Sequence, residues 1–162
     1  MRFEKFVDRR QLRATIAQML AIAPAMAGRD LRVLASDLAP HALRKAEAAT
    51  YSAKDLKAVP SDLAQAWAHI EGDTATIDDL PRSVVRFRLL NLLGEWPMSG
   101  KFDTIFCRNV MIYFDNATQR QVLQQMHAVL KPQGLLYVGH SENFTDARDL
   151  FHLRGKTIYE RV

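Results

Sequence analysis

The stretch FDTIFCRNVMIYFDNATQRQVLQQMHAVLKPQGLLYV, from Phe102 to Val138, predicts a strand, a helix and a second strand in succession. Its first six and last four residues are rich in the apolar, β-branched and aromatic residues that buried strands use. Between them Asp115 or Asn116 can cap a helix, and Lys131 to Gly134 carries the proline and glycine that end one. The helix places its apolar residues on one face: Val122, Leu123, Met126, Val129 and Leu130. Such a unit brings two parallel strands together.

The same alternation continues toward both ends of the chain. The further strand candidates are Arg2 to Val7, Leu31 to Ala35, Val84 to Leu90 and Lys156 to Arg161, and helices are expected over Arg9 to Met26 and from Pro40. Strands that alternate with helices predict an α/β fold, doubly wound, with a mostly parallel sheet covered on both faces.

One region interrupts this alternation. Ser61 to Trp67 predicts a short helix, and Trp67 to Ile70 and Thr74 to Ile77 predict two extended arms around a turn that contains Gly72. The region is either an inserted antiparallel hairpin or an irregular surface loop. We expect one domain over residues 1–162, with strand one and the first helix in residues 1–30 and the insert in residues 60–82.

Composition excludes several classes of protein. A hydrophobic content of 48% excludes global disorder, and a net charge of +4 without a long basic run argues against a nucleic-acid partner. A single cysteine, Cys107, excludes an internal disulfide, and the five histidines lack the spacing of a zinc site. The longest apolar run, Met19 to Ala27, is too short to span a bilayer. Arg9-Arg10 before it resembles an export signal, but an amphipathic helix in a cytoplasmic protein is the better interpretation.

Polar residues follow the predicted strands, where open parallel sheets bind their ligands. Asp37 suits the paired hydroxyls of a ribose, because one carboxylate accepts both hydrogen bonds, although it can instead cap a helix. Asn91 can read a purine edge or merely shape a turn. Arg108 and Asn109 follow a buried strand, where a guanidinium needs an anionic partner.

Each of these residues has a purely structural alternative. Arg108 can form a salt bridge with Asp103 or Asp115, and Tyr113 can either face a substrate or pack in the core beside Phe114. His140 is better interpreted as a hydrogen-bonded structural residue than as a base, and Cys107 as a small buried apolar side chain.

Three motifs resemble a known family. They are FCRNVMIYF (Phe106 to Phe114), LKPQGLL (Leu130 to Leu136) and GHSENF (Gly139 to Phe144), and LRGKTIY (Leu153 to Tyr159) fits the same pattern. Together they look like the chemotaxis receptor methyltransferases of the CheR type, and the resemblance covers Arg32 to Val162. It implies the Rossmann-like fold of class I S-adenosylmethionine-dependent methyltransferases with a small inserted hairpin.

The resemblance also implies an activity. The family transfers a methyl group from S-adenosylmethionine, leaving S-adenosylhomocysteine, to glutamates on the cytoplasmic helical bundle of chemoreceptors. It assigns cofactor binding to Asp37, Asn91, Leu92, Arg108 and Asn109, and catalysis to Arg108 and Tyr113. An ionised glutamate attacking an electrophilic sulfonium methyl needs alignment more than a base, and the sequence shows no catalytic dyad. Nucleic-acid methylation is disfavoured by the lack of a basic patch interleaved with aromatic residues.

The chain departs from the family near its amino terminus. Asp8-Arg9-Arg10-Gln11 stands where the family has a Gly-rich loop and paired glutamates, and we expect the family's helical receptor-binding domain to be absent. The two arginines would place positive charge beside the positively charged sulfonium of the cofactor. At an effective dielectric constant near 20, like charges ~5 Å apart repel by roughly 3 kcal/mol, so cofactor binding should be weak or absent. The alternative function is therefore a catalytically degenerate binding module or remnant. The short arms of the hairpin also predict that it does not dock a receptor tether.

Overall fold

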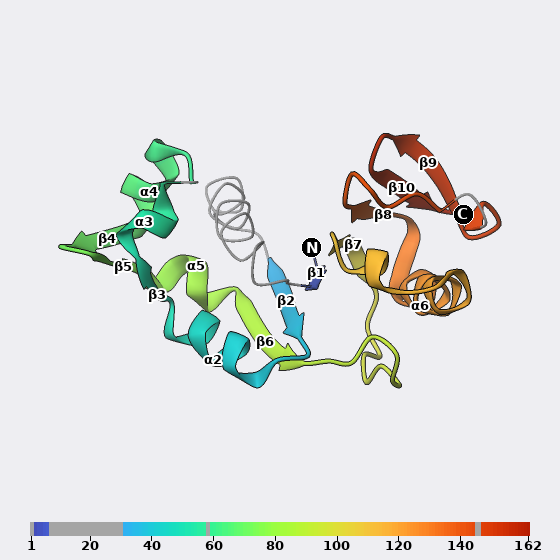
Figure 1. Cartoon of the computed structure of the whole chain (residues 1–162), viewed down its shortest axis with the longest axis horizontal. Helices are drawn as coiled ribbons and strands as arrows, with labels where there is room; N and C mark the ends of the chain where they lie inside the picture. Colours follow the sequence, from blue (N-terminus) through green and yellow to red (C-terminus); the bar gives the residue numbers. More distant parts are fainter. Residues whose placement is uncertain (1, 7–30, 58, 145–146) are drawn as a thin grey trace.

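A computed structural model describes residues 2–6, 31–57, 59–144 and 147–162 (Figure 1). Most of the described strands form a seven-stranded sheet in the order β6-β2-β1-β7-β8-β10-β9. The strands are β1 (Arg2–Phe6), β2 (Arg32–Asp37), β6 (Val85–Leu89), β7 (Phe102–Cys107), β8 (Leu130–Val138), β9 (Phe151–Gly155) and β10 (Ile158–Arg161). The pairings of β10 with β8 and with β9 are antiparallel and the other four pairings in this sheet are parallel, so the predicted mostly parallel sheet is confirmed.

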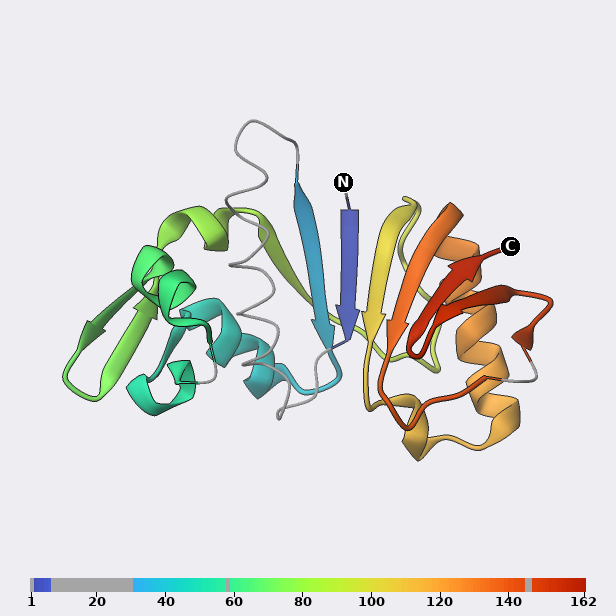
Figure 2. The same ribbon diagram turned by 90° about the horizontal axis from the view of Figure 1, so that it is seen from above.

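The first strand lies in the centre of the sheet (Figure 2). β1 pairs in parallel with β2, where Arg2 lies opposite Arg32, and with β7, where Phe3 lies opposite Thr104. The prediction of a short strand over Arg2 to Val7 is confirmed for Arg2–Phe6. The helix expected over Arg9 to Met26 and the segment Asp8 to Gln11 lie outside the described residues.

The predicted strand-helix-strand unit is present, with one corrected boundary. α6 (Asn116–Val129) begins where Asp115 accepts a 2.8 Å hydrogen bond from the backbone N–H of Thr118. It ends at Val129, so the prediction that Lys131 to Gly134 ends the helix and that Leu130 belongs to it is wrong. Those residues form the first part of β8, where the register with β7 slips and Gln133 adopts a φ of 61°. The proline and glycine therefore make a bulge in a strand rather than a helix cap.

The inserted region forms its own small sheet. β3 (Thr50–Ser52), β5 (Thr74–Ile77) and β4 (Ala68–Glu71) pair antiparallel in the order β3-β5-β4. The structure thus shows the hairpin alternative. β3 adds a third strand, which was not predicted because it has only three residues and a single buried side chain. Short helices surround this sheet and join it to the main one: α2 (Pro40–Ala48), α3 (Ala53–Leu56), α4 (Ser61–Trp67) and α5 (Asp79–Ser83).

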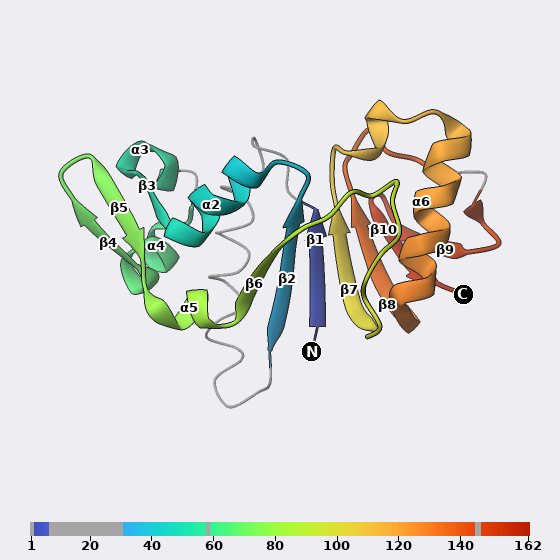
Figure 3. The ribbon, with the colours of Figure 1, turned by 90° about the horizontal axis from the view of Figure 1, so that it is seen from below.

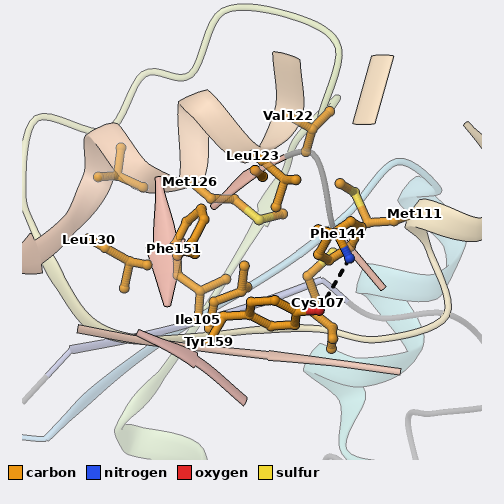
Figure 4. Close-up of a cluster of buried hydrophobic side chains, with 14 of the residues drawn as sticks. Ile105, Cys107, Met111, Val122, Leu123, Met126, Leu130, Phe144, Phe151 and Tyr159 are labelled. Carbon is orange, nitrogen blue, oxygen red and sulfur yellow. Dashed lines mark hydrogen bonds between the residues drawn. The ribbon is translucent and has the colours of Figure 1, made fainter. Parts of the chain in front are cut away.

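The largest cluster of buried side chains lies between α6 and the sheet (Figure 4). Ile105 from β7, Leu123 and Met126 from α6 and Leu136 from β8 are almost fully buried there. Cys107 is also completely buried, which confirms its interpretation as a small apolar side chain. β9 was not predicted, because its residues after Phe151 are all exposed and carry no apolar periodicity.

None of the helices in the described ranges is both long and apolar enough to cross a membrane. Within the same residues, no group of three or more metal-ligating side chains comes together.

Candidate functional site

A cavity of about 440 Å³ lies at the carboxyl ends of β2, β6 and β7. These strand ends lie on the same side of the molecule as the start of α6 (Figure 3). The cavity brings together five of the residues that the sequence singled out: Asp37, Asn91, Leu92, Asn109 and Tyr113. Arg108 is not among the described residues that line it.

Asp37 is the last residue of β2 and turns the chain toward α2. Its Oδ1 accepts a 2.7 Å hydrogen bond from the backbone N–H of Ala39. The N-cap of α2 is Ala39 itself, so Asp37 shapes the turn before the helix without being the capping residue. The other carboxylate oxygen makes no hydrogen bond within the described part of the chain, and it is available to a ligand in the cavity.

Asn91 and Leu92 form the turn after β6. The side-chain oxygen of Asn91 accepts from the backbone N–H of Leu93 at 3.0 Å, so the turn interpretation of Asn91 describes half of its amide. The carbonyl oxygen of Leu92 accepts from Trp96 Nε1 at 3.2 Å and from Gln125 Nε2 at 3.0 Å. Since Gln125 lies on α6, the helix fixes this wall of the cavity from behind.

The loop after β7 contributes the opposite wall. Asn109 adopts a left-handed backbone conformation, with φ of 56°, so successive residues of this loop face different directions and Asn109 reaches the cavity. Of the acidic residues near this loop, Asp103 forms a 2.8 Å ion pair with Lys131, and Asp115 caps α6.

Tyr113 stands at the mouth of the cavity. It closes the short helix η2 (Met111–Tyr113) and is 75% exposed, so it does not pack in the core. Met111, two residues earlier, is the core residue of this turn at 1% exposure. The phenol is therefore accessible to a second molecule that approaches the cavity.

Glu142 organises the site, although in the sequence it appeared only as part of the GHSENF motif, without a role of its own. It is 4% exposed, and its carboxylate accepts hydrogen bonds from four backbone N–H groups. Three belong to the β7 loop, at 3.0 Å from Asn109, 2.9 Å from Val110 and 2.8 Å from Met111, and the fourth is Gly139. Glu142 therefore ties the loop that carries Asn109 and Tyr113 to the loop that follows β8.

We call the carboxylate of Glu142 with its four backbone donors the clamp. Gly139 leaves the space that this clamp occupies. A Cβ atom at this position would lie 2.2 Å from the side-chain oxygen of Asn109 and 2.8 Å from Oε2 of Glu142, which is closer than real Cβ contacts allow.

Burial, and secondarily the charge of Glu142, raises the pKa of the Cys107 thiol well above its usual value. Cys107 therefore stays protonated beside the clamp and offers no nucleophile.

Gln119 holds the far end of the same loop. Its Nε2 donates to the carbonyl oxygens of Met111 and Phe114, each at 3.0 Å. His140, in contrast, is exposed in the turn after β8 and does not line the cavity. The arrangement offers one carboxylate oxygen, an amide, an exposed phenol and apolar side chains between loops that are fixed from the core side, which suits a flat apolar group that carries hydroxyls.

Comparisons with known proteins agree with this picture. The family profile for the CheR methyltransferase, SAM binding domain, matches residues 14–159. The chain is 43% identical over 133 residues to a chemotaxis protein methyltransferase of Klebsiella aerogenes, covering 79% of this chain and 46% of that protein. It is 41% identical over 150 residues to a chemotaxis protein methyltransferase of Escherichia coli, covering 90% of this chain and 51% of that protein. The chain thus spans about half the length of these relatives.

Solved structures share the fold. The N-methyltransferase NodS from Bradyrhizobium japonicum, in complex with S-adenosyl-L-homocysteine, superposes with a TM-score of 0.56 at 14% identity, covering 99% of this chain and 77% of that one. PKMT2 from Rickettsia typhi, in complex with AdoHcy, gives a TM-score of 0.52 at 15% identity, covering 85% and 20%. These likenesses confirm the predicted methyltransferase fold.

Proposed function

The chain belongs to the CheR methyltransferase family, and from that premise we propose that it binds S-adenosylmethionine and serves methyl transfer to glutamate carboxylates of chemoreceptor cytoplasmic domains. The observation that carries this proposal is the single cavity shared by Asp37, Asn91, Leu92, Asn109 and Tyr113. Its volume of about 440 Å³ is within the range of small-molecule sites.

The residues of the cavity divide the work of holding the donor. The unengaged oxygen of Asp37 would accept hydrogen bonds from the ribose hydroxyls. The Nδ2 group of Asn91 and the backbone of Leu92 would meet the adenine, because the side-chain oxygen of Asn91 is already used in its turn. Asn109 would approach the methyl-transfer end, where the family resemblance also places Arg108.

Transfer itself needs orientation rather than proton removal. When bound, the cofactor supplies an electrophilic methyl carbon on its sulfonium. Tyr113 would orient the incoming carboxylate from the mouth of the cavity, since its phenol is accessible there. Alignment at near-attack distance is the main contribution that a protein can make to such a step. Glu142 and Gln119 would act indirectly, by holding the loop that carries Asn109 and Tyr113.

The second candidate is a degenerate module that binds the cofactor weakly or not at all. The observation that favours it is the pair Arg9-Arg10 in place of the family's glutamates. Two added cations near a sulfonium should weaken binding by about a hundredfold if nothing compensates them.

Calorimetric titration of the full chain with S-adenosylmethionine and with S-adenosylhomocysteine tests both candidates. The double variant Arg9→Glu/Arg10→Glu should bind S-adenosylmethionine more tightly than the wild-type chain does, because the arginines repel its positively charged sulfonium. Adding Asp37→Asn should weaken binding of either ligand about tenfold, because a charged acceptor is lost, whereas the exposed Asp62→Asn should not.

The outcomes separate the candidates. Binding by the wild-type chain, with methyl transfer to a purified receptor cytoplasmic fragment, supports the enzyme. Binding only after the double substitution supports the degenerate module. If no variant binds either ligand, or if Asp37→Asn has no effect, the assignment of this cavity is wrong.

A further inference from the structure

A second cavity, of about 280 Å³, lies away from the strand ends. Its walls come from α2, β3, β5, α5 and β6, which surround one region of the molecule in Figure 3. Ala46, Ala49, Ile77, Pro81 and Val85 make much of the wall apolar, and all five are buried. The cavity therefore offers an apolar surface to a small apolar group.

Tyr51 brings a hydroxyl group to this surface. It is only 7% exposed and lines the cavity, yet its hydroxyl makes no hydrogen bond with any described residue. Burial raises the pKa of Tyr51 to about 12, although the charge of Arg82 lowers it, so the phenol keeps its proton. Buried phenols usually find a partner, and the hydroxyl is a donor that a ligand can satisfy.

Three arginines give the cavity a positive charge. Arg82, Arg86 and Arg88 line it, against a single lining carboxylate from Glu47. Arg82 also forms a 3.2 Å ion pair with Asp79, so Arg86 and Arg88 carry most of the uncompensated charge. Arg86 Nη1 donates to the carbonyl oxygens of Ser83 and Val85 at 3.1 and 3.0 Å, and Arg88 Nη1 donates to that of Phe87 at 2.8 Å. These bonds orient the guanidinium groups but use a minority of their N–H donors.

The same bonds make a peptide strand an unsuitable occupant. The carbonyl of Val84 accepts from β2, and the N–H of Leu90 donates to it. By alternation the carbonyls of Val85 and Phe87 point to the free edge of β6, where Arg86 and Arg88 already cover them. A compact ligand meets the remaining guanidinium donors without competing for that edge.

We propose that this cavity binds a small organic anion with an apolar body, of the aromatic carboxylate class. Its ring lies between Tyr51, Ile77 and Val85, and its carboxylate is held by Arg86 and Arg88, with Tyr51 donating a further hydrogen bond. The site is separate from the proposed methyl-donor cavity and does not depend on that function.

Titration of the full chain with 2-naphthoate, followed by two-dimensional NMR, tests this site. We expect a Kd below about 1 mM, and binding about tenfold weaker for 2-naphthamide, which has the same shape without the charge. Arg86→Gln should weaken binding of the anion about tenfold, and the matched control Arg44→Gln, on the exposed surface of α2, should not. Tyr51→Phe should weaken it about threefold.

Four results would overturn the proposal. They are the absence of 2-naphthoate binding, equal affinity for the amide, equal losses from Arg86→Gln and Arg44→Gln, and competition by S-adenosylhomocysteine at the same resonances. The last would place the anion in the cavity at the strand ends instead, and leave the methyl-donor assignment standing.

Discussion

The two cavities differ in how their polar groups are used. At the strand ends, Glu142 and Gln119 form hydrogen bonds with backbone groups, and these bonds hold the loop between β7 and α6. Beside β6, rigid helices and strands form apolar walls, and Tyr51 and the arginines keep donors for a ligand. A loop site thus needs buried polar groups to give it a shape, whereas a site between regular elements already has a shape and can keep hydrogen-bond donors for a ligand.

The largest effect should come from removing the clamp. Glu142→Ala leaves four backbone N–H groups without their acceptor, and we expect a loss of about 3–5 kcal/mol in the free energy of unfolding. Glu142→Gln should lose less, since one acceptor oxygen remains. Urea denaturation measures both, with the exposed Glu95→Ala as control. A loss under about 1 kcal/mol for Glu142→Ala would show that the loops do not depend on the clamp.

Gly139→Ala tests the space around the same clamp. Its Cβ would collide with Asn109 and Glu142, and we expect about 2–3 kcal/mol of destabilisation. Gly155→Ala is the matched control, because a Cβ there meets no atom within 4 Å. Thermal unfolding that ranks the two variants equally would contradict the close approach at Gly139.

Gln119→Ala should have a smaller effect, of about 1–2 kcal/mol, because two partly buried carbonyls lose their donor. It should also weaken any cofactor binding more than its effect on stability suggests, since it frees the loop that carries Tyr113. Gln124→Ala, on the exposed side of the same helix, provides the control in both chemical denaturation and calorimetry. Equal behaviour of the two glutamine variants would argue against a role for Gln119 in the loop.

The smallest effect should have the opposite sign. Tyr51→Phe removes a hydroxyl that makes no hydrogen bond with any described residue, so without ligand we expect no loss and a gain of up to about 1 kcal/mol in unfolding free energy. With saturating 2-naphthoate the wild-type chain should regain the advantage. A destabilised Tyr51→Phe protein without ligand would mean that the hydroxyl has an internal partner, and the contrast between the cavities would disappear.

Much of the fold was predictable because local patterns repeat over enough residues. The apolar face of α6 and the runs in β2, β7 and β8 identified these elements, and even the short β1 was expected. β3 and β9 were not predicted, because each has only one buried side chain and is defined by the strand it pairs with. Lys131 to Gly134 was misassigned for a related reason, since proline and glycine serve a strand bulge as well as a helix end.

The candidate site divides in the same way. By itself, the sequence determined which polar residues follow the strands and to which family the motifs belong, because both depend on residue type and spacing along the chain. Only the tertiary structure decided that Asp37, Asn91, Asn109 and Tyr113 share one cavity, that Glu142 supports the loop that carries Asn109 and Tyr113, and that Tyr51 and three arginines line another cavity. Those facts depend on hydrogen bonds and contacts between residues about 30 or more positions apart, and no local pattern in a single sequence records which distant partner a side chain will meet.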